Sequence, residues 1–136
     1  MSDIIAYTDG GSRHNPGKAG IGVVIYEGEK KLAELSEYVG VQTNNWAEYE
    51  ALIRALKKIK QLGLKNRSVE VRMDSELIVK QINKEYQIKE ETLWEQYMSV
   101  HNMLVKDFKD ITFVHIPREK NKEADALAND AMDNGE

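Results

Sequence analysis

Four acidic residues lie at the boundaries of predicted structural elements, where a fold most often presents its chemistry: Asp9, Glu48, Asp74 and Asp125. Three of them have a simple structural explanation. Asp9 can be a turn residue, Glu48 can complete a capping box begun by Asn45, and Asp74 can be a helix N-cap. Asp125 is harder to explain in this way, because aspartate is a poor residue in the middle of a helix. Taken singly, the structural explanation is the better one for all but Asp125.

The interpretation changes if the fold brings these carboxylates together. Asp9 and Asp74 would face one crevice if the strands that precede them are neighbours in a sheet. Carboxylates gathered in one place repel each other unless cations neutralise them, and hard oxygen ligands select Mg²⁺ or Mn²⁺. Two such ions roughly 4 Å apart favour in-line hydrolysis of a phosphodiester, because one activates water and the other stabilises the leaving oxygen.

The elements that must position these acids follow from the pattern of apolar residues. Strands are expected at 3–9, 20–27, 32–41, 68–73 and 111–116, and helices at 44–63, 76–83, 90–108 and 120–132. A tight turn at 27–31 makes the first three strands an antiparallel meander, and the later strand–helix–strand crossovers imply parallel pairing. The expected fold class is therefore α/β, a five-stranded mixed sheet with three antiparallel strands, then parallel additions, flanked by helices.

Two of the predicted helices have features that the structure can test. Asn44 or Asn45 is expected to cap the long helix, and Gly63 to end it. The helix at 90–108 carries one apolar stripe that is expected to face the core: Trp94, Tyr97, Met98, His101, Leu104, Val105 and Phe108.

Composition narrows the class of protein further. The 136 residues hold no linker or internal repeat, so a single domain over 1–136 is expected, and 41% hydrophobic with 31% charged residues is ordinary for a globular protein. No apolar run is long enough to cross a membrane, and the lack of cysteine fits the cytoplasm. The net charge of −4 argues against charge-driven adhesion to nucleic acid. It does not exclude nucleic acid as a substrate, since carboxylates that hold cations also make the balance acidic.

Four local motifs in order carry a family resemblance: "YTDGGSRHNPGKAGIGVVI", "TNNWAEYEALIRAL", "VRMDSELIVKQI" and "HIPREKNKEADALA". Over about residues 3–132 the chain resembles ribonuclease HI (type 1 ribonuclease H) in its compact form. The resemblance implies the ribonuclease H-like fold and an RNA–DNA hybrid duplex as the partner. It also implies an endonuclease that hydrolyses the RNA strand with two Mg²⁺ ions, or Mn²⁺ in their place, and leaves 5′-phosphate and 3′-hydroxyl ends.

Matched position by position, the resemblance assigns the four acids to a metal-binding quartet. Asp9 would bridge both ions, Glu48 and Asp74 would complete one site, and Asp125 the other. Two further residues either support this site or cap helices: Ser75 and Asn121.

The resemblance also assigns a substrate surface. Gly10 and Gly11 would let the RNA backbone pass close to the acids. Asn44 and Asn45 would bind in the minor groove, since amides both donate to and accept from a 2′-hydroxyl and base edges.

Phosphate contacts are the least distinctive part of the match. Thr43 and Asn15 would hold a phosphate of the DNA strand, with turn hydrogen bonding as an equal alternative. Longer members of the family place a histidine on the loop before the last helix. Here Arg118 occupies that loop and is expected to contact phosphate, whereas His115, at a strand end, is expected to pack or cap.

The chain departs from the longer bacterial form at 83–104, where that form carries a basic protrusion. This segment is short and mixed in charge, which predicts weaker binding of hybrid.

Three alternatives to a hybrid-cleaving enzyme stay open. A DNA-directed nuclease of the same superfamily is disfavoured by the Asn44–Asn45 pair. The others are a non-catalytic hybrid-binding module and an excised domain of a polymerase-linked protein. From Met1 to the last helix the chain reads as complete, with no obligatory protein partner, and is expected to be a monomer.

Overall fold

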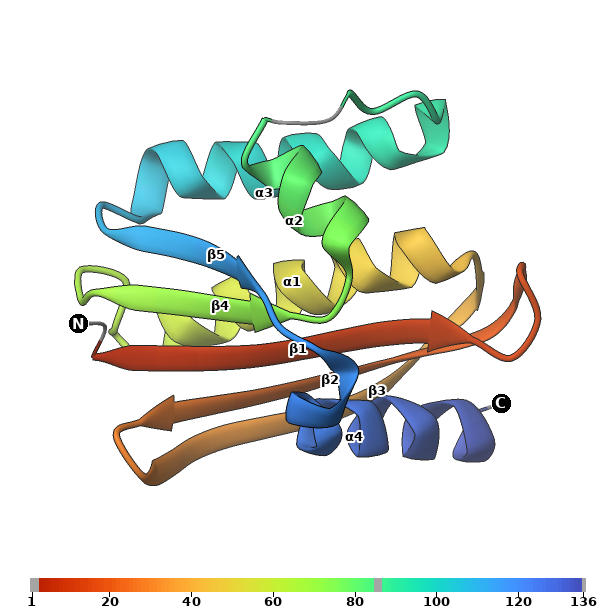
Figure 1. The fold of residues 1–136 in the computed structure, drawn as a ribbon, viewed down its shortest axis with the longest axis horizontal. Helices are drawn as coiled ribbons and strands as arrows, with labels where there is room; N and C mark the ends of the chain where they lie inside the picture. Colours follow the sequence, from red (N-terminus) through yellow and green to blue (C-terminus); the bar gives the residue numbers. More distant parts are fainter. Residues whose placement is uncertain (1–2, 85–86, 136) are drawn as a thin grey trace.

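The computed structural model describes residues 3–84 and 87–135 (Figure 1). Its strands are β1 (Ile4–Ser12), β2 (Gly17–Glu27), β3 (Lys30–Gln42), β4 (Val69–Met73) and β5 (Ile111–His115). Its α-helices are α1 (Asn44–Gln61), α2 (Glu76–Ile82), α3 (Trp94–Asp107) and α4 (Lys122–Asn134), with single 3₁₀ turns at Glu91–Leu93 and Arg118–Lys120. The expected element order is confirmed. The 3₁₀ turns account for the shift of both late helices from their predicted starts.

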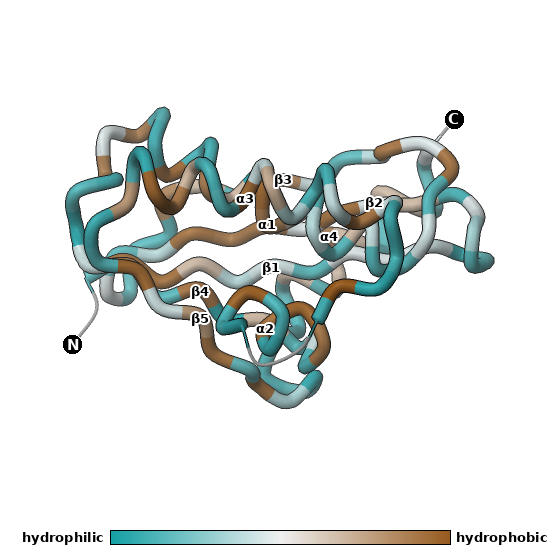
Figure 2. Tube along the Cα trace, turned by 90° about the horizontal axis from the view of Figure 1, so that it is seen from above, coloured by the Kyte–Doolittle hydropathy of each residue, from teal (hydrophilic) through white to brown (hydrophobic). Residues whose placement is uncertain are grey.

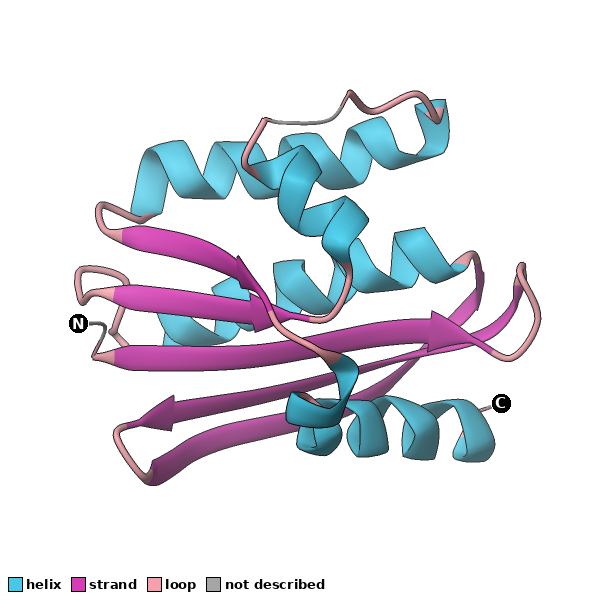
Figure 3. Ribbon diagram, viewed as in Figure 1, coloured by secondary structure: helices cyan, strands magenta, loops and turns pink. Residues whose placement is uncertain are grey.

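The sheet has the strand order β3-β2-β1-β4-β5 (Figure 3). β1, β2 and β3 pair antiparallel, whereas β4 pairs parallel with β1 on one side and with β5 on the other. The predicted mixed sheet is therefore confirmed, and β1 and β4 are neighbours. One boundary differs in a way that matters for the site: β1 does not end at Asp9 but continues to Ser12, paired with β2.

Helices cover both faces of the sheet. Alternate residues of β1 and β2 point into a core under α1, where Ile4, Ala6, Val23 and Ile25 pack with the apolar face of that helix. On the opposite face α4 lies across β2 so closely that a Cβ at Gly22 would collide with the helix backbone. Figure 1 shows α3 beside α1, on the side away from α4. Hydrophobic and hydrophilic residues alternate along the helices in Figure 2, the pattern expected of helices with one buried and one solvent-facing side.

The predicted core stripe of α3 is wrong in part. Trp94, Met98 and Val105 are exposed, Val105 by 74%. The buried positions of this helix are Gln96, Val100 and Asp107. Two of these are polar and are buried with partners: Gln96 donates to the Trp46 carbonyl and to Glu50, and Asp107 pairs with Lys60 at 3.0 Å. A pattern of apolar residues could not reveal an inner face that is held partly by polar contacts.

The described residues include no helix that is both long and apolar enough to cross a membrane. Within the predicted mixed-charge segment 83–104, residues 85 and 86 lie outside the described part of the chain.

Candidate active site

The ends of two neighbouring parallel strands bring Asp9 and Asp74 together. The pairing of β1 with β4 stops at Thr8 and Met73, and each acid is the next residue of its strand's chain. β1 keeps its antiparallel bonds to β2 on the other side, where Asp9 lies opposite Gly22. Asp9 therefore stands on a rigid strand at the point where the sheet opens, and not in a turn as its sequence alone suggested.

Glu48 reaches the same point from α1. The N–H of Gly10 donates a hydrogen bond of 2.5 Å to Oε1 of Glu48. A Cβ at Gly10 would lie 2.7 Å from the backbone nitrogen of Glu48, a separation that real Cβ atoms do not adopt. The absence of a side chain at Gly10 thus allows β1 and α1 to approach, and this approach places the buried carboxyl of Glu48 beside Asp9.

Ligand oxygens of Asp9, Glu48 and Asp74 lie within 4.8 Å of one another. Burial, together with the charge of Asp74, raises the pKa of Asp9 from 3.8 to about 7. Burial and the charge of Asp9 raise the pKa of Glu48 well above its usual value. The gathered carboxyls thus resist ionising together unless positive charge is supplied.

Asp125 approaches this group from α4. It lines the same cleft, and its carboxyl is close enough to Asp9 to add to the rise of the Asp9 pKa. It does not lie in the middle of a helix, as predicted, but in the first turn of α4, where a negative charge is favourable. Its Oδ1 lies 3.5 Å from Nη2 of Arg118, whose side chain is 79% exposed at the rim.

Two hydroxyl residues cap the helices beside the site. Thr43, and not Asn44 or Asn45, is the N-cap of α1, because its side chain accepts the N–H of Trp46 at 3.2 Å. Ser75, and not Asp74, is the N-cap of α2, and accepts the N–H of Ile78 at 3.3 Å. Gly63, with φ +77°, follows the end of α1 as predicted.

Asn44 and Asn15 join the β1–β2 loop to the start of α1. Oδ1 of Asn44 accepts the N–H of Ser12 at 2.8 Å, and Oδ1 of Asn15 accepts the N–H of Asn44 at 3.0 Å. Asn44 and Asn45 line the cleft, whereas Asn15 and Thr43 lie outside its wall. The turn bonding expected as an alternative for Asn15 and Thr43 is therefore present.

The cleft has a volume of about 420 Å³. It holds the four acids together with Gly10, Gly11, Asn44, Asn45 and Arg118, so the fold collects nearly all of the predicted site residues. Its donor set of carboxylate oxygens suits a hard divalent cation such as Mg²⁺ or Mn²⁺. The raised pKa values of two of these acids fit the same occupant, because a cation would remove their mutual repulsion.

Sequence reasoning missed four residues of the cleft wall: Ser12, Arg13, Asn129 and Met132. Asn129 and Met132 come from the second half of α4, and Arg13 from the β1–β2 loop. Residues separated by more than a hundred positions carry no local signal that they meet. Only the placement of α4 across β2 brings them together.

A five-stranded sheet of this order, with carboxylates gathered where its neighbouring strands β1 and β4 part, defines the ribonuclease H-like class of α/β proteins. Residues 7–131 match the family described as "Reverse transcriptase-like". The chain is 40% identical over 129 residues to ribonuclease HI of Halobacterium salinarum, which covers 94% of this chain and 63% of that protein. It is 39% identical over 132 residues to the bifunctional protein Rv2228c of Mycobacterium tuberculosis, across 96% of this chain.

Solved structures agree with these relatives. LC11-RNase H1, isolated from compost, is 53% identical and superposes with a TM-score of 0.92 over 98% of this chain and 97% of that one. The same protein in complex with an RNA/DNA hybrid gives a TM-score of 0.92 over 96% of both chains. The chain belongs to the ribonuclease HI family. It spans about a third of the length of Rv2228c and its mycobacterial counterparts.

Proposed function

We propose that this chain folds as one ribonuclease H domain and is an endonuclease that hydrolyses the RNA strand of RNA–DNA hybrids. The observation that carries the proposal is the meeting of Asp9, Glu48 and Asp74 within 4.8 Å, with Asp125 in the same cleft. A structural set of acids would be spread over the surface or paired with basic residues. These acids instead face one another, at the cost of raised pKa values for Asp9 and Glu48.

The four acids would hold two Mg²⁺ ions. Asp9, which couples to the other three carboxyls, is the residue we assign to both ions. Glu48 and Asp74 complete one site and Asp125 the other. When bound, the ions supply an activated water and neutralise the charge that develops on the leaving oxygen, which gives 5′-phosphate and 3′-hydroxyl ends. No side chain then needs to act as a nucleophile.

The asparagines at the start of α1 would orient the hybrid. The Oδ1 of Asn44 accepts hydrogen bonds from the backbone N–H and the hydroxyl of Ser12. These bonds fix the orientation of the Asn44 amide and leave its NH₂ group as a donor for the minor groove. Asn45 lines the cleft beside it. Amides in these positions can contact a 2′-hydroxyl and base edges without reading sequence.

Asn15 and Thr43 are suited to hold a phosphate of the DNA strand. Each side-chain oxygen accepts a backbone N–H, from Asn44 and Trp46 respectively. The donors that remain, an amide NH₂ and a hydroxyl, are the groups that bind a phosphate oxygen. On the other side of the cleft, the exposed guanidinium of Arg118 would contact a phosphate near Asp125.

The test is cleavage of labelled RNA–DNA hybrid beside labelled RNA duplex and DNA duplex, each with Mg²⁺, with Mn²⁺ and with EDTA. Wild type should cut only the hybrid, only with metal, and only in the RNA strand. Asp9→Asn should abolish cleavage, and Asp110→Asn, an exposed acid outside the cleft, should leave it intact.

Four outcomes would overturn the proposal. Metal-independent cleavage, or full activity of Asp9→Asn, would exclude the metal centre. Cleavage of DNA duplex would indicate the DNA-directed alternative. Binding of hybrid with no cleavage at any Mg²⁺ or Mn²⁺ concentration would indicate a non-catalytic module.

A further inference from the structure

Two ties join strand β1, which carries Asp9, to helix α4, which carries Asp125. The first is at the start of the helix, where Nδ2 of the buried Asn121 donates to the carbonyl of Thr8 at 2.9 Å. The second is near its end, where the guanidinium of Arg13 binds the helix. The two ties thus flank Asp9 in the strand and Asp125 in the helix.

Arg13 holds the helix by several bonds at once. Its Nη1 donates to Oδ1 of Asn129 at 3.1 Å, and its Nη2 to the carbonyl of the same residue at 3.3 Å. Its Nε donates to Oδ1 of Asp133 at 3.1 Å, and Nη2 forms an ion pair with that carboxylate. Asn129 in turn donates to the carbonyl of Asp125 at 3.0 Å. Arg13 is therefore linked to the backbone of Asp125 through a single side chain.

The basic residues near the C-terminal end of α4 come from the segment that connects β1 to β2. The last turn of the helix carries no basic residue of its own. Arg13 and Lys18, from the two sides of the β1–β2 loop, supply the cations that the negative end of a helix favours, and Lys18 binds the Gly135 carbonyl at 3.2 Å. The N–H of Arg13 donates to the Lys18 carbonyl at 2.9 Å, which closes the loop that carries both.

Small residues let α4 approach β2 closely. The helix rests on Gly20 and Gly22 of β2 through Ala124, Ala128 and Ala131. These contacts bury apolar surface, which is a non-directional contribution. Directional hydrogen bonds and ion pairs at the two ends of the helix can set its position along its axis.

That position matters because Asp125 lies outside the tight group of three acids found among the described residues. Asp9, Glu48 and Asp74 are fixed by β1, α1 and the end of β4. The separation of Asp125 from Asp9 is set instead by where α4 lies on the sheet.

We infer that Arg13 is a positioning residue for the metal centre: by holding α4 against β1 it keeps Asp125 at the distance from Asp9 that a second cation requires. The inference rests on the proposed function, because it assigns Asp125 to a metal site. The sequence pattern around Arg13 does not indicate this role.

The test titrates the metal-free protein with Mn²⁺ alone, by calorimetry, and then measures the Mg²⁺ dependence of hybrid cleavage. Arg13→Ala should weaken one of the two Mn²⁺ sites about tenfold or more and leave the other unchanged, as supporting residues of metal ligands commonly do. The Mg²⁺ requirement for cleavage should rise in parallel, with KM for hybrid unchanged at saturating Mg²⁺. Arg13→Lys should restore part of the affinity, because lysine can pair with Asp133 but cannot also bind Asn129.

A second variant separates positioning from phosphate binding, since Arg13 also lines the cleft. Asp133 does not line the cleft and its side chain is well exposed, so Asp133→Ala is expected to keep the fold while it frees the Arg13 guanidinium from one partner. If Arg13 positions α4, Asp133→Ala weakens the same Mn²⁺ site. If Arg13 instead binds substrate, releasing it from Asp133 leaves Mn²⁺ affinity unchanged and KM for hybrid equal or lower, and the inference is wrong.

Ser36→Ala is the matched control. It removes the 2.6 Å bond from Ser36 to the Leu127 carbonyl, which ties α4 to β3 and not to the strand of Asp9. Metal binding should not change in this variant. An equal loss in Ser36→Ala and Arg13→Ala would mean that any weakening of α4 has the same effect, and would overturn the inference. If wild type bound Mn²⁺ but failed to cut hybrid, the proposed function would fail while the Mn²⁺ titration still decided the role of Arg13.

Discussion

Gly10 and Glu48 meet through a single 2.5 Å hydrogen bond from a strand N–H to a helix carboxyl, one residue away from Asp9. The bond forms because Gly10 has no side chain to separate β1 from α1. The family resemblance implies that this glycine makes room for RNA, and the structure supplies another reason, which is room for the helix that carries Glu48. The two glycines after Asp9 therefore have different environments.

Gly10→Ala should destabilise the fold by about 2–3 kcal/mol, because its Cβ would overlap the backbone of α1. Displacement of Glu48 should also remove most of the hybrid cleavage. Gly11→Ala is the control, since its Cβ would meet Asn44 Oδ1 and Met132 Cε at an ordinary 3.6 Å. Chemical denaturation of both variants is the measurement. Equal stability of the two would contradict the packing role of Gly10.

The metal-free protein should lose stability as the pH rises from about 4 to about 7. The folded state holds a proton on Asp9 with a pKa of about 7, against 3.8 for the free side chain. That contribution is complete below the lower value and is lost as the pH passes the higher one. Denaturation in EDTA at pH 5 and pH 8 measures the loss.

Asp9→Asn should reduce this pH dependence and raise the stability of metal-free protein at pH 8, by on the order of 2 kcal/mol. Mg²⁺ should stabilise wild type at pH 8 and have little effect on the variant. Asp110→Asn controls for the loss of one negative charge. A wild-type stability that rises steadily between pH 5 and pH 8 in EDTA, matched by Asp9→Asn, would contradict the shared burial of these acids.

Asn44→Asp should keep the fold and impair substrate binding. Aspartate retains the oxygen that accepts from Ser12, so the β1–β2 loop stays joined to α1. It replaces the amide donor by a negative charge that faces a polyanion. We expect KM for hybrid to rise roughly tenfold, the effect of about 1.4 kcal/mol, with unfolding unchanged. An unaltered KM would remove Asn44 from the substrate surface.

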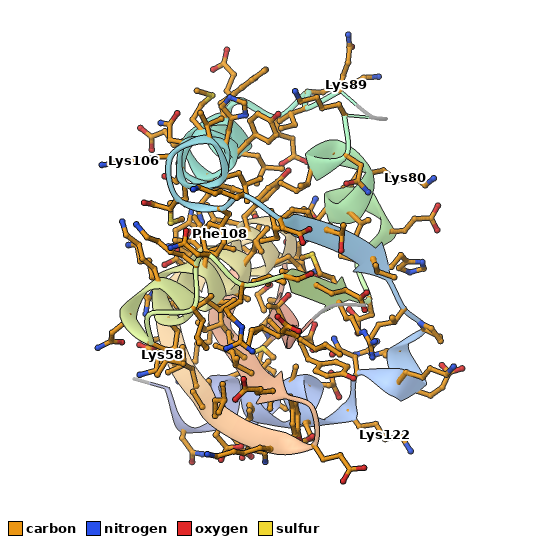
Figure 4. The ribbon with its side chains drawn as sticks, turned by 90° about the vertical axis from the view of Figure 1, so that its left-hand side faces the viewer. Lys58, Lys80, Lys89, Lys106, Phe108 and Lys122 are labelled. Carbon is orange, nitrogen blue, oxygen red and sulfur yellow. The ribbon has the colours of Figure 1, made fainter. Side chains whose placement is uncertain are left out.

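Lys60→Ala should cost about 1 kcal/mol of stability and leave cleavage unchanged, because Lys60 pairs with the buried carboxylate of Asp107 on α3. Lys57→Ala, at an exposed position of the same helix, should change stability by less than about 0.5 kcal/mol. Figure 4 shows Lys58 and Lys106 pointing outward at this end of the molecule. A raised KM for hybrid in either variant would instead indicate that these lysines contact the DNA strand.

Much of the fold could be predicted because it depends on local and topological rules, whereas the four acids were assigned to one site only through the family resemblance. Alternation located the strands, and the crossover rule predicted parallel pairing after the meander. That β1 and β4 are neighbours, which brings Asp9 and Asp74 together, was a condition of the prediction and is seen in the structure. Gly63 ended α1 as its backbone freedom suggests.

The predictions that failed concern details that local sequence patterns do not determine, such as the exact start of a helix or the partner that a side chain finds on another element. Whether Thr43, Asn44 or Asn45 caps α1 depends on a shift of one or two residues in the helix start. Gln96 and Asp107 can lie on the inner face of α3 because α1 supplies their partners: Gln96 donates to Glu50, and Asp107 accepts from Lys60. The partners of Arg13 are Asn129 and Asp133, which lie beside it only because α4 packs across the sheet.

The use of Thr43 and Ser75 as helix caps has a consequence for how this scaffold can change over generations. The hydroxyl side chains of Thr43 and Ser75 are the N-caps of α1 and α2, so the side chains of the neighbouring Asn44 and Asp74 are not needed as caps. On the proposed function, substitutions there would impair substrate or metal binding while the helices still form. Such substitutions would remove the proposed activity and keep the fold. Homologues that retain only the fold could then acquire other functions.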